Sequence, residues 1–287
     1  MDFKRIEWIF FLVFLGVNIF LFSIYREGLQ DESYVSYSEK TESLETRLKK
    51  DQITHKKELS TKRSEGYYLS GEQTNFYMAI QEQQAAKNDY SYLKNITVTE
   101  NGVIDYPSNH YIDPDEVNET FSGFLRDEKS VLYGNEYTYL PQFSNLNGEF
   151  PELVAAQSYG GIPIHDDTAQ ITLSLEKSET DDLLRIVQYS QSHIGNLEEL
   201  REKADLYSEQ DAIETLYVNN KIPSNSTITF SKLAYSQIYK IREKNVYVPV
   251  WFIGISSNST TLQVEQVNAM SNTIITSNAV IRVEKDN

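Results

Sequence analysis

Residues 6–25 read IEWIFFLVFLGVNIFLFSIY, a predominantly apolar run that follows Lys4 and Arg5 and precedes a long, mostly polar sequence. At a rise of about 1.5 Å per residue, a helix of this length crosses a hydrocarbon core of roughly 30 Å with its backbone polar groups paired internally. The run is longer than the apolar part of a secretory signal, and residues 22–26 offer no small-residue cleavage site. We therefore expect a transmembrane helix at residues 6–25.

The charges beside this run predict its orientation. Lys4 and Arg5 lie on the short side, and basic residues next to a membrane helix favour the cytoplasmic side. We expect residues 1–5 to lie in the cytoplasm and the sequence after residue 25 to lie outside, so that the protein is a single-pass, membrane-anchored ectodomain.

The composition restricts the function of the external part. The 287 residues include no cysteine, which excludes disulfides, thiolate metal sites and cysteine nucleophiles. There are 26 Lys and Arg against 42 Asp and Glu, a formal net charge of -16 at pH 7. Because nucleic acid binding requires a basic surface, we expect no nucleic acid partner. The 20 Tyr and 13 Phe supply enough apolar material for one large or two modest domains.

Residues 26–65 are rich in charge and poor in apolar side chains, a pattern typical of a stalk. Leu44 and Leu48 are spaced for one short helix with a single contact stripe. Basic residues prevail between Arg47 and Arg63. A run of charges is usually solvated, so we interpret this one as a stalk surface in preference to a docking site for an acidic partner or anionic lipid.

Globular sequence begins at residue 66. The Asn-Gly pair at 101–102, between two alternating runs, predicts a hairpin. Asp113-Pro114-Asp115-Glu116 predicts the start of a helix with Asp113 as its N-cap. The elements expected in this half are strands at 66–71, 96–100, 103–106, 136–143, 153–159 and 169–175, with helices at 74–86 and from 113.

A similar order of elements follows in the second half. Ser208 to Asp211 predicts the start of a helix, and the sequence then indicates strands at 227–238, 246–255, 261–267 and 273–276. In the strand around Trp251, the residues on both faces are apolar, as in a central strand covered on both sides. We predict an α+β fold of antiparallel sheets with packed helices in two similar lobes, lobe 1 at residues 66–195 and lobe 2 at residues 196–287.

Two segments contain possible metal ligands. Asp113, Asp115 and Asn118 resemble the start of a calcium loop, but the glycine and the final glutamate of that loop are missing, so helix capping explains them better. The segment 165–167, His-Asp-Asp, offers one imidazole and two carboxylates, but no second histidine follows at ligand spacing. We interpret it as a turn and expect no metal site.

Acidic residues cluster once more, at Glu198, Glu199, Glu202 and Asp205. Such a group can supply a carboxylate pair for glycan cleavage, but acids at this spacing ordinarily form a solvated helix face. Recognised nucleophile, zinc-binding and phosphate-binding motifs are missing. We therefore expect no catalytic residue, no cofactor and no enzyme activity.

Two polar residues interrupt the membrane run on one helical face. Glu7 and Asn18 are 11 positions apart, so at about 100° per residue they lie within about 20° of each other. An amide near mid-bilayer is costly unless it finds a partner, such as a neighbouring transmembrane helix. The alternative is that Glu7 reaches the cytoplasmic interface and Asn18 bonds its own backbone. The expected partner-facing stripe consists of Glu7, Phe11, Phe14, Asn18 and Leu21.

Several segments share their order and spacing with one known family. They are the opening MDFKRIEWIFFLVFLGVNIFLF, Gly66-Tyr67-Tyr68-Leu69, Gln188-Tyr189-Ser190-Gln191, the helix at 212–217, Val248-Pro249-Val250-Trp251, and 267–269 followed by 274–275. On these segments the chain resembles the YycI family, membrane-anchored regulatory proteins of the YycF/YycG (WalR/WalK) two-component system. The resemblance covers essentially the full length.

The resemblance implies a non-enzymatic regulator in the cell membrane of a Gram-positive bacterium, with a role in cell wall homeostasis. It implies two partners, the sensor histidine kinase YycG (WalK) and a YycH-like membrane protein, and a homodimer stays open. A second hypothesis is an extracytoplasmic ligand-binding module for a cell-wall fragment or peptide, which a cleft with a few convergent polar groups would favour. A third is a wall-active hydrolase, which a histidine-centred or carboxylate constellation in a deep cleft would favour.

Overall fold

The computed structural model describes residues 8, 11–22, 42–91, 93–146, 150–178, 182–257, 262–276 and 281–283. The chain forms two compact units, Met1–Arg47 and Leu48–Asn287. Residues 11–22 of the first unit are helical. No helix within the described ranges is both long and apolar enough to cross a membrane. The expected cytoplasmic residues 1–5, Glu7 and the end of the expected membrane run at 23–25 lie outside the described residues.

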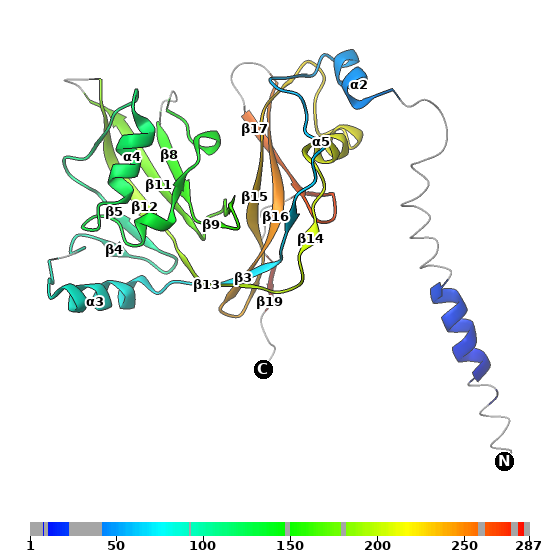
Figure 1. The fold of residues 1–287 in the computed structure, drawn as a ribbon, viewed down its shortest axis with the longest axis horizontal. Coiled ribbons are helices and arrows are strands. Elements are labelled where there is room, and N and C mark those ends of the chain that lie inside the picture. The colour runs from blue at the N-terminus through cyan, green and yellow to red at the C-terminus, as the bar shows by residue number, and fades with distance from the viewer. Residues whose placement is uncertain are drawn as a thin grey trace. The chain divides into compact units, whose positions relative to one another are not determined.

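The second unit contains two large, mainly antiparallel sheets (Figure 1). The first has eight strands in the order β1-β15-β16-β17-β18, with β3 pairing with both β13 and β16, and β19 pairing with β15. Its strands are β1 (Thr54–His55), β3 (Leu69–Gln73), β13 (Ile194–Glu199), β15 (Thr227–Ile241), β16 (Lys244–Ser256), β17 (Leu262–Asn268), β18 (Thr273–Ile275) and β19 (Ile281–Val283).

The second sheet has seven strands in the order β4-β5-β12-β11-β8-β7, and β6 also pairs with β12. Its strands are β4 (Thr97–Val98), β5 (Val103–Asp105), β6 (Tyr111–Ile112), β7 (Thr138–Tyr139), β8 (Glu152–Ala156), β11 (Gln170–Lys177) and β12 (Leu184–Gln191). Two small strand pairs complete the set, β9 (Ser158–Tyr159) with β10 (Ile162–Pro163) and β2 (Glu65–Gly66) with β14 (Ala204–Asp205).

Polar caps define the ends of the two longest helices of the second unit. Asn75 accepts a hydrogen bond from the Met78 N–H at the start of α3, and Ser208 forms a reciprocal capping box with Asp211 at the start of α5. The α-helices are α2 (Leu44–Lys50), α3 (Phe76–Lys87), α4 (Val117–Leu125) and α5 (Glu209–Val218), and the 3-10 helices are η2 (Gly134–Glu136) and η3 (Pro141–Phe143).

Each large sheet has its own hydrophobic core. Helices α3 and α4 contribute to the core of the seven-stranded sheet, where Phe121 and Tyr189 are fully buried. In the eight-stranded sheet, Tyr235 and Tyr247 are buried with Leu69 in one cluster, and Phe252 belongs to another. The expected α+β fold of helices packed on antiparallel sheets is thereby confirmed.

Two local predictions in the first half are wrong. The helix expected from Asp113 begins only at Val117, because the Asp113 carboxylate accepts a hydrogen bond from the Asp115 N–H at 2.9 Å and forms a turn instead. The strand expected at 136–143 reduces to β7 between two 3-10 helices, in part because Pro141 has no N–H to donate to a sheet.

The sheets also differ from the expected domain boundaries. Strand β3 pairs with β16, so the first strand expected for lobe 1 belongs to the sheet of the second half, and the expected boundary after residue 195 falls inside β13. Residues 48–65, expected as stalk, belong to the second unit. There β1 pairs with β15, and Leu48, Ile53 and Leu59 are buried. Leu48 belongs to the contact stripe expected with Leu44, and the short helix is present as α2. Ile53 and Leu59 follow no helical or strand period, so their burial left no sequence signal.

Candidate functional site

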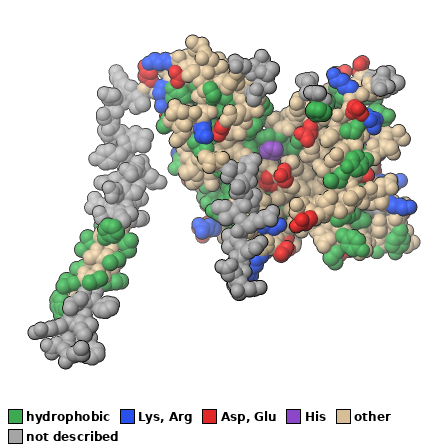
Figure 2. All heavy atoms as spheres, turned by 180° about the vertical axis from the view of Figure 1, so that it is seen from behind, with side chains coloured by type: hydrophobic (Ala, Val, Ile, Leu, Met, Phe, Trp, Pro, Cys, Tyr) green, Lys and Arg blue, Asp and Glu red, His purple; other side chains and the backbone are tan. Residues whose placement is uncertain are grey.

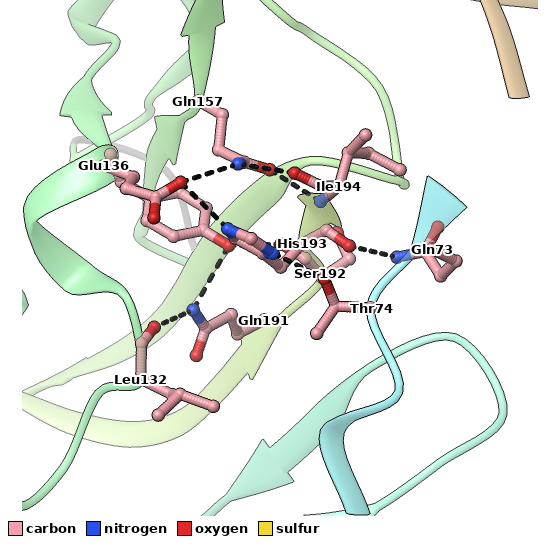
Figure 3. Close-up of polar contacts among 10 residues, drawn as sticks. Gln73, Thr74, Leu132, Glu136, Gln157, Gln191, Ser192, His193 and Ile194 are labelled. Atoms are coloured by element: carbon pink, nitrogen blue, oxygen red, sulfur yellow. Dashed lines mark hydrogen bonds and ion pairs between the residues drawn. The ribbon is translucent and has the colours of Figure 1, made fainter. Parts of the chain in front are cut away.

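The two connections between the large sheets lie side by side (Figure 1). The chain leaves the eight-stranded sheet after Gln73 and returns to it at Ile194, and these two residues are paired in register. The Thr74 N–H donates to the His193 carbonyl at 2.9 Å. Polar side chains surround these connections, and we call this group the junction (Figure 3). His193, Gln157 and Gln191 in it are buried, Thr74 is partly buried, and Glu136 is exposed.

His193 lies at the centre of the junction and is 5% exposed. Its Nε2 lies 2.9 Å from Oε2 of Glu136, and its Nδ1 lies 2.6 Å from Oγ1 of Thr74 (Figure 3). The ring stacks on Tyr133 with a centroid distance of 4.4 Å. Burial lowers the pKa of His193, although the hydrogen bond with Glu136 opposes this shift. A neutral imidazole can donate at one nitrogen and accept at the other, so it suits a bridge between two elements.

Gln157, which follows β8, joins the seven-stranded sheet to the first residue of β13. Its Nε2 donates to the Ile194 carbonyl at 3.0 Å, and its Oε1 accepts from the Ile194 N–H at 2.8 Å (Figure 3). The same Nε2 lies 3.2 Å from Oε2 of Glu136. The amide therefore pairs with this backbone as a neighbouring strand would.

A second group of hydrogen bonds holds the end of β12. The Tyr137 hydroxyl donates to the Ser192 carbonyl at 2.5 Å, and the Gln191 side-chain amide donates to the Tyr137 hydroxyl oxygen at 3.2 Å and to the Leu132 carbonyl. Burial raises the pKa of Tyr137, so its hydroxyl stays protonated at neutral pH. These polar groups are buried and mutually satisfied, which favours one rigid arrangement of the connections.

Thr74, His193 and Glu136 place a hydroxyl, an imidazole and a carboxylate in line, the order of groups in a hydrolase triad. The imidazole is enclosed, however, because His193 is only 5% exposed. A nucleophile needs room for a substrate beside it, so we interpret this line as a structural link. The sequence gives no sign of it, because His193 is 119 positions from Thr74 and 57 from Glu136.

The structure separates the side chains of the His-Asp-Asp segment. His165 stacks on Phe143, whereas Asp166 turns to the Thr168 N–H at 2.9 Å and the Gln237 N–H at 2.7 Å. This is the expected turn. Within the described part of the chain, no three His, Asp or Glu side chains are grouped to hold a metal ion.

The other acidic candidates have separate partners. Glu198 and Glu199 belong to strand β13 and not to the expected helix face. Glu198 lies 3.2 Å from Nζ of Lys244, and Glu199 accepts a hydrogen bond from the Tyr159 hydroxyl at 2.8 Å. Successive residues of a strand point to opposite faces, so Glu198 and Glu199 form no carboxylate pair here.

The helix at 11–22 carries four of the five expected stripe residues. Phe11, Phe14 and Leu21 are exposed, and Glu7 lies outside the described residues. The Asn18 side-chain amide donates to the Phe14 carbonyl at 2.8 Å, the bond to its own backbone that was the alternative expectation. An asparagine amide has two N–H donors and one carbonyl acceptor, so this bond uses only part of its capacity.

A family model described as YycI protein matches residues 31–270. The chain belongs to the YycI family. The matched region includes the junction and both large sheets from β1 to β17. Membership of the YycI family links the chain to the YycFG two-component system.

Other comparisons add little to the family assignment. None of the curated proteins compared with the chain matches it. The solved structure of an uncharacterized protein from Eubacterium rectale is similar over 78% of this chain and 91% of that chain, with 9% sequence identity and a TM-score of 0.43. At this score the likeness supports no functional assignment.

Proposed function

We propose that this YycI family protein is a non-enzymatic regulator of the sensor histidine kinase YycG (WalK), and that it acts with a YycH-like partner. The family match over residues 31–270 is the observation that carries this proposal, because it connects the chain to the YycFG system. In the proposal, residues 6–25 cross the cell membrane with residues 1–5 in the cytoplasm. The rest of the chain lies outside, where it contacts the partners.

Exposed apolar side chains on the helix at 11–22 support the membrane location. Five consecutive residues, 11–15, are all exposed, and Phe14 reaches 69%. Consecutive residues of a helix point in all directions, so the apolar surface surrounds the helix. Exposing apolar surface to water costs about 25 cal/mol per Å², and a helix that is apolar all round belongs in an apolar environment.

Asn18 supports a contact with a partner helix. Its amide keeps hydrogen-bonding capacity beyond the bond to Phe14, and in a membrane the source of a partner is another protein segment. Such a bond contributes about 0.5 to 2 kcal/mol. If the helix packs better against one signalling state of the kinase, the difference in binding free energy shifts the equilibrium towards that state. A difference of this size changes the equilibrium constant between the two states severalfold.

Replacement of the membrane helix tests the proposal. A chain in which a foreign transmembrane helix of equal length replaces residues 6–25 should reach the membrane but fail to restore normal expression of kinase-controlled genes. Asn18→Leu should also reach the membrane, because it makes the segment more apolar, and should weaken regulation. Val17→Leu and Ile19→Leu, off the stripe, serve as matched controls and should keep regulation. Full regulation by the foreign helix would place the contact in the external part.

A further inference from the structure

A cavity of about 250 Å³ opens on one face of the seven-stranded sheet. The strand register places Ile104, Ser190 and Thr172 side by side on this face, across β5, β12 and β11. The neighbouring residues Tyr189 and Ile171 point the other way, into the core that α3 and α4 share with the sheet. The cavity therefore lies on the polar face of the sheet, away from these helices.

Two loops also line this cavity, and both are held by the eight-stranded sheet. The loop between β4 and β5 is held by Gln73 of β3, whose Nε2 donates to the Asn101 carbonyl at 3.2 Å. The loop before β11, which contributes Asp167, is held where the Asp166 carboxylate accepts from the Gln237 N–H of β15 at 2.7 Å. The cavity thus lies where the two sheets meet, and ligand sites are common at such interfaces.

Polar side chains that lack partners converge on this cavity. The polar side chains of the lining include Thr99, Asn101, Asp167, Gln170, Thr172 and Ser190. The side chains of Asn101, Asp167 and Ser190 form no hydrogen bond with another described residue. Oε1 of Gln170 is buried without a described partner, and its Nε2 lies 3.5 Å from Oγ1 of Thr172, at the limit of a hydrogen bond. A concave site with several free polar groups favours a polar ligand.

The kinds of polar group in the lining indicate the class of ligand. Hydroxyl and amide side chains both donate and accept hydrogen bonds, as the hydroxyl groups of a sugar do. The Asp167 carboxylate has two acceptor oxygens, so it can accept from two neighbouring sugar hydroxyls. Ile104 supplies apolar surface for the C–H groups of a sugar ring. A wholly apolar ligand would leave the polar groups without partners, which is costly.

An anionic ligand fits this lining poorly. None of the described residues that line the cavity is Lys or Arg, so a phosphate or carboxylate group would meet Asp167 without a balancing cation. On the face shown in Figure 2, the half of the molecule with the seven-stranded sheet exposes mainly uncharged groups. The cavity volume lies below the range of roughly 300 to 1,000 Å³ that drug-sized ligands occupy, which suits a single sugar ring.

We propose that this cavity binds one ring of a neutral saccharide, the terminal unit of a glycan. Asp167 and Asn101 hold the ring hydroxyls from the two loops. Thr172 and Ser190 hold them from the sheet, and Ile104 contacts the apolar face of the ring. This site is independent of the membrane-helix contact proposed above, so either proposal stands if the other fails.

Calorimetric titration of the full-length protein tests the site, in a detergent without a sugar headgroup so that the detergent cannot compete. The probes are the neutral disaccharides cellobiose and N,N′-diacetylchitobiose, at least one of which should bind saturably. Asp167→Asn should weaken this binding about tenfold, because a charged acceptor forms stronger hydrogen bonds than an amide does. Thr172→Val keeps the shape of the side chain but removes its hydroxyl, and should weaken binding about fivefold.

Matched controls distinguish this site from unspecific association. Asp115→Asn and Thr97→Val make the same two changes at exposed positions that do not line the cavity, and both variants should bind as the unchanged protein does. Thermal unfolding of each variant shows that it is folded. The proposal is overturned if the folded protein shows no saturable binding of either disaccharide up to about 20 mM, or if the Asp167 or the Thr172 variant binds as the controls do.

Discussion

The side-chain amide of Gln157 pairs with both backbone polar groups of Ile194, accepting from its N–H at 2.8 Å and donating to its carbonyl at 3.0 Å. Both residues are buried. This contact joins the end of β8 in one sheet to the start of β13 in the other. Because water cannot replace the amide there, this side chain satisfies two backbone groups that would otherwise be buried without partners.

Gln157→Leu should lower the free energy of unfolding by about 2 to 4 kcal/mol, because it leaves two buried backbone groups without partners. Chemical denaturation monitored by tryptophan fluorescence measures the change. Gln142→Leu, at an exposed position on η3, is the matched control and should stay within about 0.5 kcal/mol of the unchanged protein. A Gln157 variant as stable as the control would show that the contact contributes nothing.

His165 should make the fold sensitive to acid. Its pKa is about 4 in the folded protein against an ordinary value of 6.5. The unfolded chain therefore binds this proton more readily between those values, so stability is complete above about pH 6.5 and decreases as the pH falls towards about 4. As the pH falls from about 6.5 to 4.5, the free energy of unfolding of the His165→Phe variant should decrease by about 2 kcal/mol less than that of the unchanged protein.

Asp166 acts in the opposite direction, since burial raises its pKa and protonation then favours the folded state. Both proteins contain Asp166, so its effect cancels in the comparison of denaturation curves at each pH. Equal pH dependence of the His165→Phe variant and the unchanged protein would contradict the assignment of the acid sensitivity to His165.

Gly102 permits a close approach between the β4-β5 hairpin and the end of β12. A Cβ atom at this position would lie 2.0 Å from the Gln191 carbonyl oxygen, which belongs to the backbone and cannot move aside alone. Gly102→Ala should therefore cost about 1 to 3 kcal/mol in stability. Gly123→Ala, inside α4 where nothing lies within 4 Å of the added atom, should instead gain about 0.5 to 1 kcal/mol. Thermal unfolding distinguishes the two variants, and equal melting temperatures would refute the steric argument.

We predict that Trp251 stabilises the fold and has no catalytic role. It lies in β16, and its Nε1–H donates to the Tyr207 carbonyl at 2.8 Å. Trp251→Ala should cost about 3 kcal/mol through the cavity it leaves, and Trp251→Phe should cost less because most of the packing remains. Urea denaturation gives both values. A Trp251→Ala variant of unchanged stability that loses partner binding would instead assign Trp251 to an interface.

Elements encoded by local chemistry were predictable from the sequence. The helix start at Ser208 and the hairpin around Asn101-Gly102 involve residues at most seven positions apart, and both are present. The apolar faces of β16 likewise predicted a strand covered on both sides, and nearly all its residues are buried. Such signals need no knowledge of the remaining chain.

Non-local choices were not predictable. The sequence around Leu69 indicates a strand but cannot say that it pairs with Tyr247 in the second half of the chain. The junction is harder still, because only the tertiary fold brings Thr74, Glu136 and His193 together from distant positions in the chain. Each of these residues is ordinary in its own segment, and only the tertiary fold gives it partners.

In the proposed function, the membrane helix contacts the kinase or its YycH-like partner through one face. The chain has no cysteine, so single cysteines can be placed along the helix and crosslinked in membranes that contain both candidate partners. Phe14→Cys and Leu21→Cys, on the stripe with Asn18, should crosslink to a partner, whereas Val17→Cys and Ile19→Cys should not. Equal crosslinking from all four positions, or none from the stripe, would contradict the claim.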